Sequence, residues 1–177
     1  TGLDVATQRH VLDTVRGQTE SQEAAGELDG HVLAAAADEL TAAFDSENGG
    51  FGGAPKFPSP HNLLFLLREW RRTGQDEYLS MVEATLAAMR AGGIWDQVGC
   101  GFHRYATDAH WFLPHFEKML YDQALLAIAY TEGFLATGRP DFKQTALDIF
   151  AYVHRDLTSP EGLFFGAEDA DSEGVEG

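Results

Sequence analysis

The stretch GGIWDQVGCGFHRYATDAHWFLPHFEKMLYDQALL, residues 92–126, joins two helical patterns through a long loop rich in glycine and aromatic residues. Before it, residues 76–91 place apolar side chains on one stripe of a helix. After it, residues 116–136 are apolar on nearly every side, which predicts a helix buried on several faces. The residues of this stretch that can do chemistry therefore concentrate in a connection between two helices.

The alternation of helices and loops extends outward from this stretch. Further helices are predicted over residues 29–44, 61–72 and 141–157. Two connections are tight turns, at 73–75 and 137–140, and three are long loops, at 45–60, 92–115 and 158–177. Successive antiparallel helices place alternate connections at opposite ends, so we expect the three long loops to lie together at one end. Gly74, Gly92 and Gly138 follow predicted helices, where a left-handed residue is expected.

The three long loops resemble one another, which predicts a repeat. They read GGFGG at 49–53, GCGF at 99–102 and EGLFFG at 161–166, about 50–60 residues apart, the length of a two-helix repeat. Such hairpins either stack into a solenoid or close into a ring. We predict an all-α fold, an (α/α) toroid with its long loops on one face. The last loop stops in mid-pattern at Gly177, so about half of the ring is expected here, and hairpin faces left without a neighbour are expected to favour self-association.

The predicted organisation has two parts. Residues 27–177 form the N-terminal part of an (α/α)6 toroid domain. Residues 1–26 are interpreted as a linker helix followed by a mobile polar segment, because residues 17–26 lack apolar periodicity.

Composition excludes several classes of partner. The formal charge of -16, from 28 acidic and 12 basic residues, repels phosphate backbones and anionic lipid, so neither nucleic acid nor a membrane surface is expected as a partner. No apolar run approaches the ~20 residues that span a bilayer. The single cysteine, Cys100, cannot form an internal disulfide and fits a reducing, cytoplasmic compartment. We expect no cofactor.

Three stretches carry a family resemblance: GGFGGAPKFPSP (49–60), residues 92–126 and FFGAEDADSEG (164–174). They closely resemble the family of thioredoxin-domain-containing proteins related to spermatogenesis-associated protein 20, over essentially residues 30–177. The resemblance implies a helical toroid similar to the N-acylglucosamine 2-epimerase and six-hairpin glycosidase folds. It also implies a preceding thioredoxin-like domain in the parent chain, whose redox motif this sequence lacks.

The second long loop offers acid–base groups. His103, His115 and Glu117 are candidate catalytic residues, since two imidazoles and a carboxylate can move protons at neutral pH. A pair of imidazoles suits proton transfer at the carbon beside a sugar carbonyl, as a 2-epimerase requires. Arg104 is a candidate substrate-binding residue that would hold an anionic oxygen. The alternative is that these residues tie the loop together, with Glu117 at a helix N-terminus.

The third loop offers carboxylates. Asp169 and Asp171 are candidate catalytic residues, since two carboxyl groups with separated pKa values serve as acid and base in glycoside hydrolysis. The alternatives are a hard-cation site, which lacks the EF-hand spacing, and a turn in which the side chains accept backbone hydrogen bonds. We predict no metal.

Aromatic and basic residues complete the candidate site. Tyr105 and Tyr121, with Trp95 and Trp111, are expected to bind substrate by offering flat faces to a sugar. Lys56, stiffened by neighbouring prolines, is expected to bind an anionic ligand group, with a solvated lysine as the alternative.

The sequence thus predicts a carbohydrate-active domain with acid–base chemistry of the sugar isomerase or epimerase kind. The alternatives are glycoside hydrolysis, or a non-catalytic module that binds a ligand or partner beside a thioredoxin-like domain. Alone, the present chain is expected to be inactive.

Overall fold

The computed structural model describes residues 30–171 and 174. The predicted N-terminal helix and linker, residues 1–26, lie outside the described residues. The helices are α2 (Gly30–Ala43), α3 (Pro60–Thr73), α4 (Asp76–Ala91), α5 (Leu120–Thr137) and α6 (Pro140–Asp156). None of the described helices is long and apolar enough to cross a membrane.

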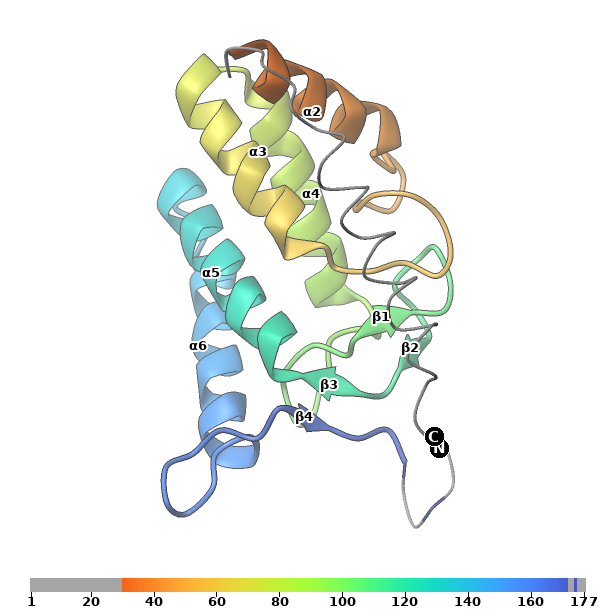
Figure 1. Ribbon diagram of the computed structural model, residues 1–177, viewed down its shortest axis with the longest axis vertical. Helices are drawn as coiled ribbons and strands as arrows, with labels where there is room; N and C mark the ends of the chain where they lie inside the picture. The colour runs from red at the N-terminus through yellow and green to blue at the C-terminus, as the bar shows by residue number, and fades with distance from the viewer. Residues whose placement is uncertain (1–29, 172–173, 175–177) are drawn as a thin grey trace, which may run out of the picture. The chain divides into compact units, whose positions relative to one another are not determined.

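Helix α5 lies between its neighbours and is buried on several faces, as predicted. It packs against α3 on one side and α6 on the other, and α3 also packs against α4 (Figure 1). Its Leu126, Ala129 and Tyr130 are fully buried in the core. The Tyr130 hydroxyl donates a hydrogen bond of 2.7 Å to the carbonyl of Leu86 in α4. The core therefore runs between antiparallel hairpins, as a helical repeat requires.

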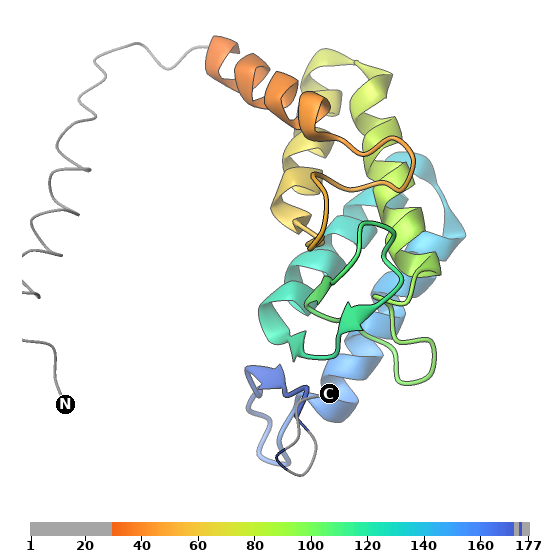
Figure 2. The same ribbon diagram turned by 90° about the vertical axis from the view of Figure 1, so that its right-hand side faces the viewer.

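The long connections meet at one end of the helices, as expected (Figure 2). They are the first loop (44–59), the second loop (92–119) and the third loop (157–171). Four two-residue strands lie in them: β1 (Tyr105–Ala106), β2 (Pro114–His115), β3 (Lys118–Met119) and β4 (Ala167–Glu168). β1 pairs with β2 within the second loop, and β3 pairs with β4 of the third, both antiparallel. A bridge between Lys56 and Ala106 joins the first loop to the second.

The loops share one local structure, which confirms the repeat. Each begins with a small hairpin closed by an antiparallel bridge: Phe44 with Phe51, Trp95 with Phe102 and Thr158 with Phe164. In the first two hairpins an aspartate, Asp45 or Asp96, accepts hydrogen bonds from the amides that follow it. The third hairpin has Ser159 at this place, whose hydroxyl accepts a hydrogen bond from the Leu163 amide.

Two local predictions are wrong. Helix α5 begins at Leu120, because residues 116–119 are extended and Lys118 pairs with Glu168 across β3 and β4. Glu117 is therefore not a helix N-terminal charge. Gly92 does not adopt the left-handed conformation that Gly74 and Gly138 do adopt. Gly92 is instead needed for space, since a Cβ there would lie 2.6 Å from the Trp111 carbonyl oxygen.

Candidate active site

The candidate site lies where the β1–β2 hairpin meets the start of α5. The Arg104 amide donates a hydrogen bond of 2.7 Å to the Glu117 carbonyl, and its guanidinium donates one of 2.8 Å to Glu117 Oε2. This pair closes the two arms of the second loop on each other. The site is thus built on paired backbone segments that hold its side chains in place.

Asp122, on the first turn of α5, is a largely buried carboxylate whose pKa is raised. Its side chain is only 8% exposed, and it forms no hydrogen bond or ion pair with any described residue. Burial raises the pKa of Asp122 to about 6, with the nearby Arg104 opposing the rise and Glu117 adding to it. A carboxyl group with a pKa close to neutral can both give and take a proton.

The two candidate histidines have different surroundings. His103 is buried, with Nδ1 3.2 Å from the Phe116 carbonyl oxygen and its ring against the edge of Phe116. Burial lowers the pKa of His103, and the neighbouring Lys118 lowers it further, so the ring is neutral at pH 7. His115 stacks on Tyr105, with ring centroids 4.9 Å apart. His115 Nδ1 is buried and has no hydrogen-bond partner among the described residues.

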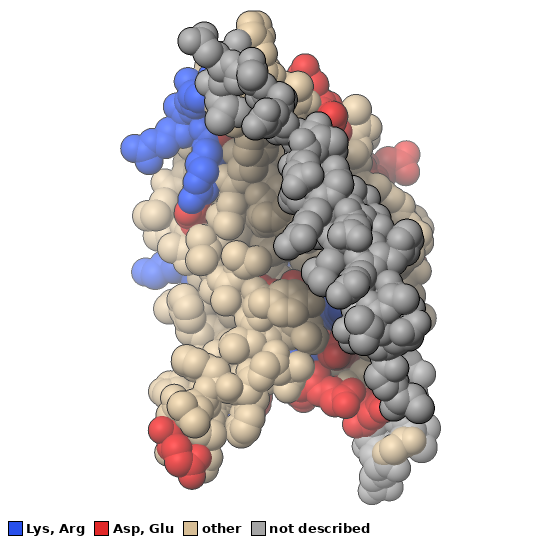
Figure 3. Space-filling view, in the orientation of Figure 1, with Lys and Arg blue, Asp and Glu red and all other residues tan. Residues whose placement is uncertain are grey.

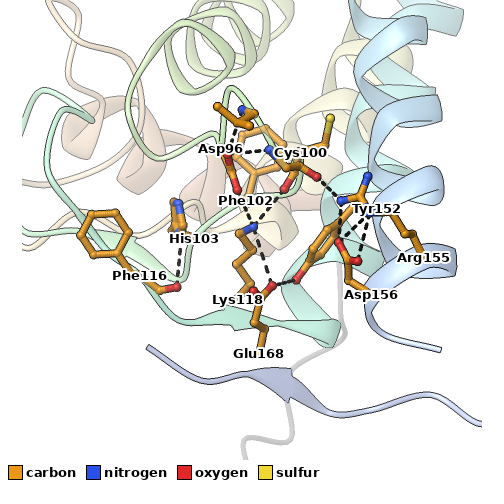
Figure 4. A network of polar contacts seen from close by, with 12 residues as sticks. Asp96, Cys100, Phe102, His103, Phe116, Lys118, Tyr152, Arg155, Asp156 and Glu168 are labelled. Carbon is orange, nitrogen blue, oxygen red and sulfur yellow. Dashed lines mark hydrogen bonds and ion pairs between the residues drawn. The ribbon is translucent and has the colours of Figure 1, made fainter. Parts of the chain in front are cut away.

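A buried lysine ties the second loop to the third. Lys118 Nζ donates hydrogen bonds to Asp96 Oδ2 at 2.8 Å and to the Cys100 carbonyl at 3.1 Å, and lies 3.7 Å from Glu168 Oε2 (Figure 4). It also lies 4.6 Å from the centre of the Tyr152 ring, whose hydroxyl donates a hydrogen bond of 2.6 Å to Glu168.

This network sets the charge of its carboxylates. Burial would raise the pKa of Asp96, but the hydrogen bonds from Lys118 and from the Gly99 and Val98 amides outweigh it and lower that pKa to about 2. Burial and the hydrogen bond to Glu168 raise the pKa of the Tyr152 hydroxyl above its usual range. The phenol is therefore a fixed donor, and the network keeps the third loop attached at β4.

Comparison with known proteins shows what the chain is similar to. No family model matches it. Spermatogenesis-associated protein 20 from Homo sapiens is 49% identical over 138 residues, which are 76% of this chain and 18% of the human protein. The chain is a homologue of part of spermatogenesis-associated protein 20. It spans less than a fifth of the length of the curated relatives that it matches.

Solved structures with the same fold identify the architecture of this chain. Cellobiose 2-epimerase from Bacillus thermoamylovorans superposes with a TM-score of 0.66 at 16% identity, over 79% of this chain and 41% of that one. An unsaturated glucuronyl hydrolase specific for heparin superposes with a TM-score of 0.61 at 15% identity, over 74% and 40%. The predicted all-α toroid fold is confirmed.

Two tryptophans that were expected to bind substrate lie in the core of this domain. Trp95 and Trp111 are 1% exposed; Trp95 lies against Phe102, and the Trp111 indole donates a hydrogen bond of 3.0 Å to the Asn48 carbonyl. Neither indole presents a free face to a sugar in this structure.

Lys56 is fully buried rather than at the rim. Its ammonium group forms an ion pair with Asp45 and donates a hydrogen bond of 2.9 Å to the Ala109 carbonyl. The hydrogen bond from Lys56 holds the pKa of Asp45 well below its usual range. An anionic ligand would reach Lys56 only if this structure rearranged.

The acidic segment of the third loop is placed differently from expectation. Asp169 and Asp171 are exposed, and Asp169 Oδ1 accepts a hydrogen bond from the Asp171 amide, which is a turn contact. Glu168 is the acidic residue that joins the network. Residues 30–171 hold no cluster of three or more side chains suited to a metal ion.

Asp122 and Glu168 were not among the residues predicted to be catalytic or to bind substrate, whereas Tyr105, Arg104, His115 and Glu117 were, and these four do come together. Tyr121 is half exposed beside them on α5. A signal for Asp122 was present, since it is an acidic residue in the first turn of a largely apolar helix, but its lack of a partner among the described residues is visible only in the structure.

Two hollows on this domain lie away from Asp122 and the residues around it. One, of about 500 Å³, is lined by the second halves of α3 and α5, including Trp70, Leu135 and Arg68, whose guanidinium is already paired with Glu132. The other lies between α5 and α6 and is largely apolar. Neither contains an unpaired acid–base group, so the chemistry points to the loop end.

Proposed function

We propose that the loop end of this domain carries out acid–base chemistry on a carbohydrate, with Asp122 as the group that takes up and returns the proton. The observation that supports this most is the buried, unpartnered Asp122 with its pKa raised to about 6. A largely buried carboxyl group with a raised pKa and no partner among the described residues is typical of functional sites.

The reaction that fits best is isomerisation or epimerisation of a sugar. Both begin with removal of a proton from the carbon beside a carbonyl group, and a carboxylate whose pKa is near neutral is suited to this step. The stacked rings of Tyr105 and His115, and the ion pair of Arg104 with Glu117, would hold the β1–β2 hairpin in place beside Asp122. An epimerase on the same fold supports this choice.

Glycoside hydrolysis is the second candidate, because the site holds two carboxyl groups in different states. Asp122 is partly protonated at neutral pH, and Glu117 is paired with Arg104 and influences Asp122 directly. Acid and base roles in hydrolysis require this kind of difference. A hydrolase on the same fold is consistent with it.

Proton exchange with solvent separates these functions. The full-length protein that contains this chain would be incubated with a panel of reducing mono- and disaccharides in D2O, and deuterium at C2 followed by NMR. Epimerisation or isomerisation predicts incorporation, and Asp122→Asn should lower its rate by about 10²–10⁴-fold. The control is Asp38→Asn, an exposed aspartate on α2.

Each result has a clear meaning. Release of new reducing ends without deuterium incorporation would favour hydrolysis. An active wild type whose rate survives Asp122→Asn would remove Asp122 from the mechanism. No turnover, with sugar binding intact, would favour a ligand-binding module attached to a thioredoxin-like domain.

A further inference from the structure

We infer that the sugar bound at this site carries a cationic nitrogen, as in an amino sugar with a free amine, and not a carboxylate or a phosphate. The inference rests on the proposed function for the carbohydrate nature of the ligand. It concerns the charge of that ligand, for which the contacts of the nearby cations and of the nearby carboxylates give two separate arguments.

First, every cation near the site already has an anionic partner. Arg104 is paired with Glu117 at 2.8 Å. Lys118 is 4% exposed and is held by Asp96 at 2.8 Å, with Glu168 at 3.7 Å. An anionic ligand group at the site would therefore have to displace a carboxylate from one of these cations.

Second, the site retains carboxylate oxygens that no described residue uses. Asp122 makes no hydrogen bond or ion pair, although more than nine-tenths of its surface is buried. Glu117 uses Oε2 for Arg104, and its Oε1 makes no hydrogen bond within the described residues. A ligand ammonium group would give these oxygens the charged donor that they lack.

The charge around these groups acts in the same direction. Residues 96–122 and 164–171 contain seven acidic and two basic side chains. On the face seen in Figure 3, Asp and Glu gather beside β3 and β4, whereas Lys and Arg gather at the other end, over α3. A field of one sign attracts oppositely charged ligands and repels those of its own sign.

The test compares closely related hexoses that carry a positive, a neutral or a negative group. Binding of glucosamine, N-acetylglucosamine, glucose and glucuronate to the full-length protein would be measured by titration calorimetry at low salt and about pH 7. We expect glucosamine to bind at least tenfold more tightly than glucose or N-acetylglucosamine, and glucuronate to bind most weakly. Added salt should shrink the advantage of glucosamine, because exposed charges are screened.

Variants assign the preference to the named carboxylate. Asp122→Asn should remove most of the advantage of glucosamine over glucose, and Asp38→Asn should leave this advantage unchanged. Binding of glucose with no advantage for glucosamine, or tightest binding of glucuronate, would overturn the inference and leave the proposed function standing. Failure of every sugar to bind would overturn both.

Discussion

The ammonium group of Lys118 and the carboxylate of Asp96 form a hydrogen bond of 2.8 Å, although the lysine side chain is only 5% exposed. Breaking a buried pair by removing one partner typically costs about 3–5 kcal/mol, because the other charge is left without compensation. Asp96 is partly exposed and keeps its amide contacts, so we place the cost at the lower end of that range.

Lys118→Met is therefore expected to lower the free energy of unfolding by about 3 kcal/mol. The matched control, Lys143→Met, removes an exposed lysine from α6 and should cost less than about 1 kcal/mol. Chemical denaturation of both variants beside the wild type would measure the difference. Equal losses would show that the network around Lys118 contributes no more than a surface lysine.

The pH dependence of stability should reflect the same pair. Because the folded pKa of Asp96 is lowered from 3.8 to about 2, its contribution is complete above about pH 4 and is lost as the pH falls towards 2. In Lys118→Met this contribution should largely disappear, so the free energy of unfolding should depend less on pH between about pH 2 and 4. Denaturation midpoints between about pH 2 and 5 would reveal this, and an unchanged acid limb would contradict the assignment.

Ionisation of Asp122 should lower the stability of the fold, whereas ionisation of Asp96 raises it. Its folded pKa lies above 3.8, so the ionised form is disfavoured in the folded protein and stability falls as the pH rises from about 4 to 6. The rise to about 6 corresponds to about 3 kcal/mol at 1.36 kcal/mol per pKa unit, an upper bound because side chains relax.

Asp122→Asn is accordingly expected to stabilise the fold above about pH 6 by roughly 1–3 kcal/mol while it lowers the rate of turnover by about 10²–10⁴-fold. Thermal unfolding at pH 5 and pH 8 would measure the effect, which should be small at the lower pH. A variant that is less stable at both values would mean that Asp122 has a structural partner instead of a functional role.

Gly101 is expected to be irreplaceable for reasons of space. It has a φ of 83°, and a Cβ there would lie 2.7 Å from Tyr152 Cδ1, beneath the Lys118 network. Gly74 has a similar φ of 75° but open space around it, so Gly74→Ala should cost about 1 kcal/mol. Gly101→Ala should cost roughly 2–4 kcal/mol, since overpacking adds to the strain. Similar melting temperatures for the two variants would refute the steric account.

Self-association is expected through the apolar face of α5 and α6. Ile128, Leu147 and Phe150 are each about half exposed, and Ile128 and Phe150 line the apolar hollow between these helices. Exposed apolar patches of this kind favour association. Phe150→Glu should shift the chain towards monomer in light scattering, whereas Leu163→Glu, on the third loop, should not. A wild-type monomer at high concentration would contradict this expectation.

The helices were predictable because their apolar periodicity is local, and α4 has the bounds that its pattern indicated. The start of α5 was not predictable, because β3 pairs with β4, about fifty residues away in the sequence, and this pairing holds the chain extended before Leu120. The same limit applies to the site. Sequence proximity grouped Arg104 with Glu117 correctly, but it could not show that Lys56 is buried against Trp111.

The two buried lysines have a consequence for any ring that would be built by copying one helical hairpin. Lys56 closes the first loop but lies 5.3 Å from the ring centre of Trp111 in the second, and Lys118 closes the second loop but lies over Tyr152 of α6. In both cases the lysine of one long loop packs against an aromatic side chain from a later part of the chain. A gene fragment encoding one hairpin would carry a lysine without the aromatic that covers it. The unit that recombination can copy successfully should therefore span one hairpin and the beginning of the next.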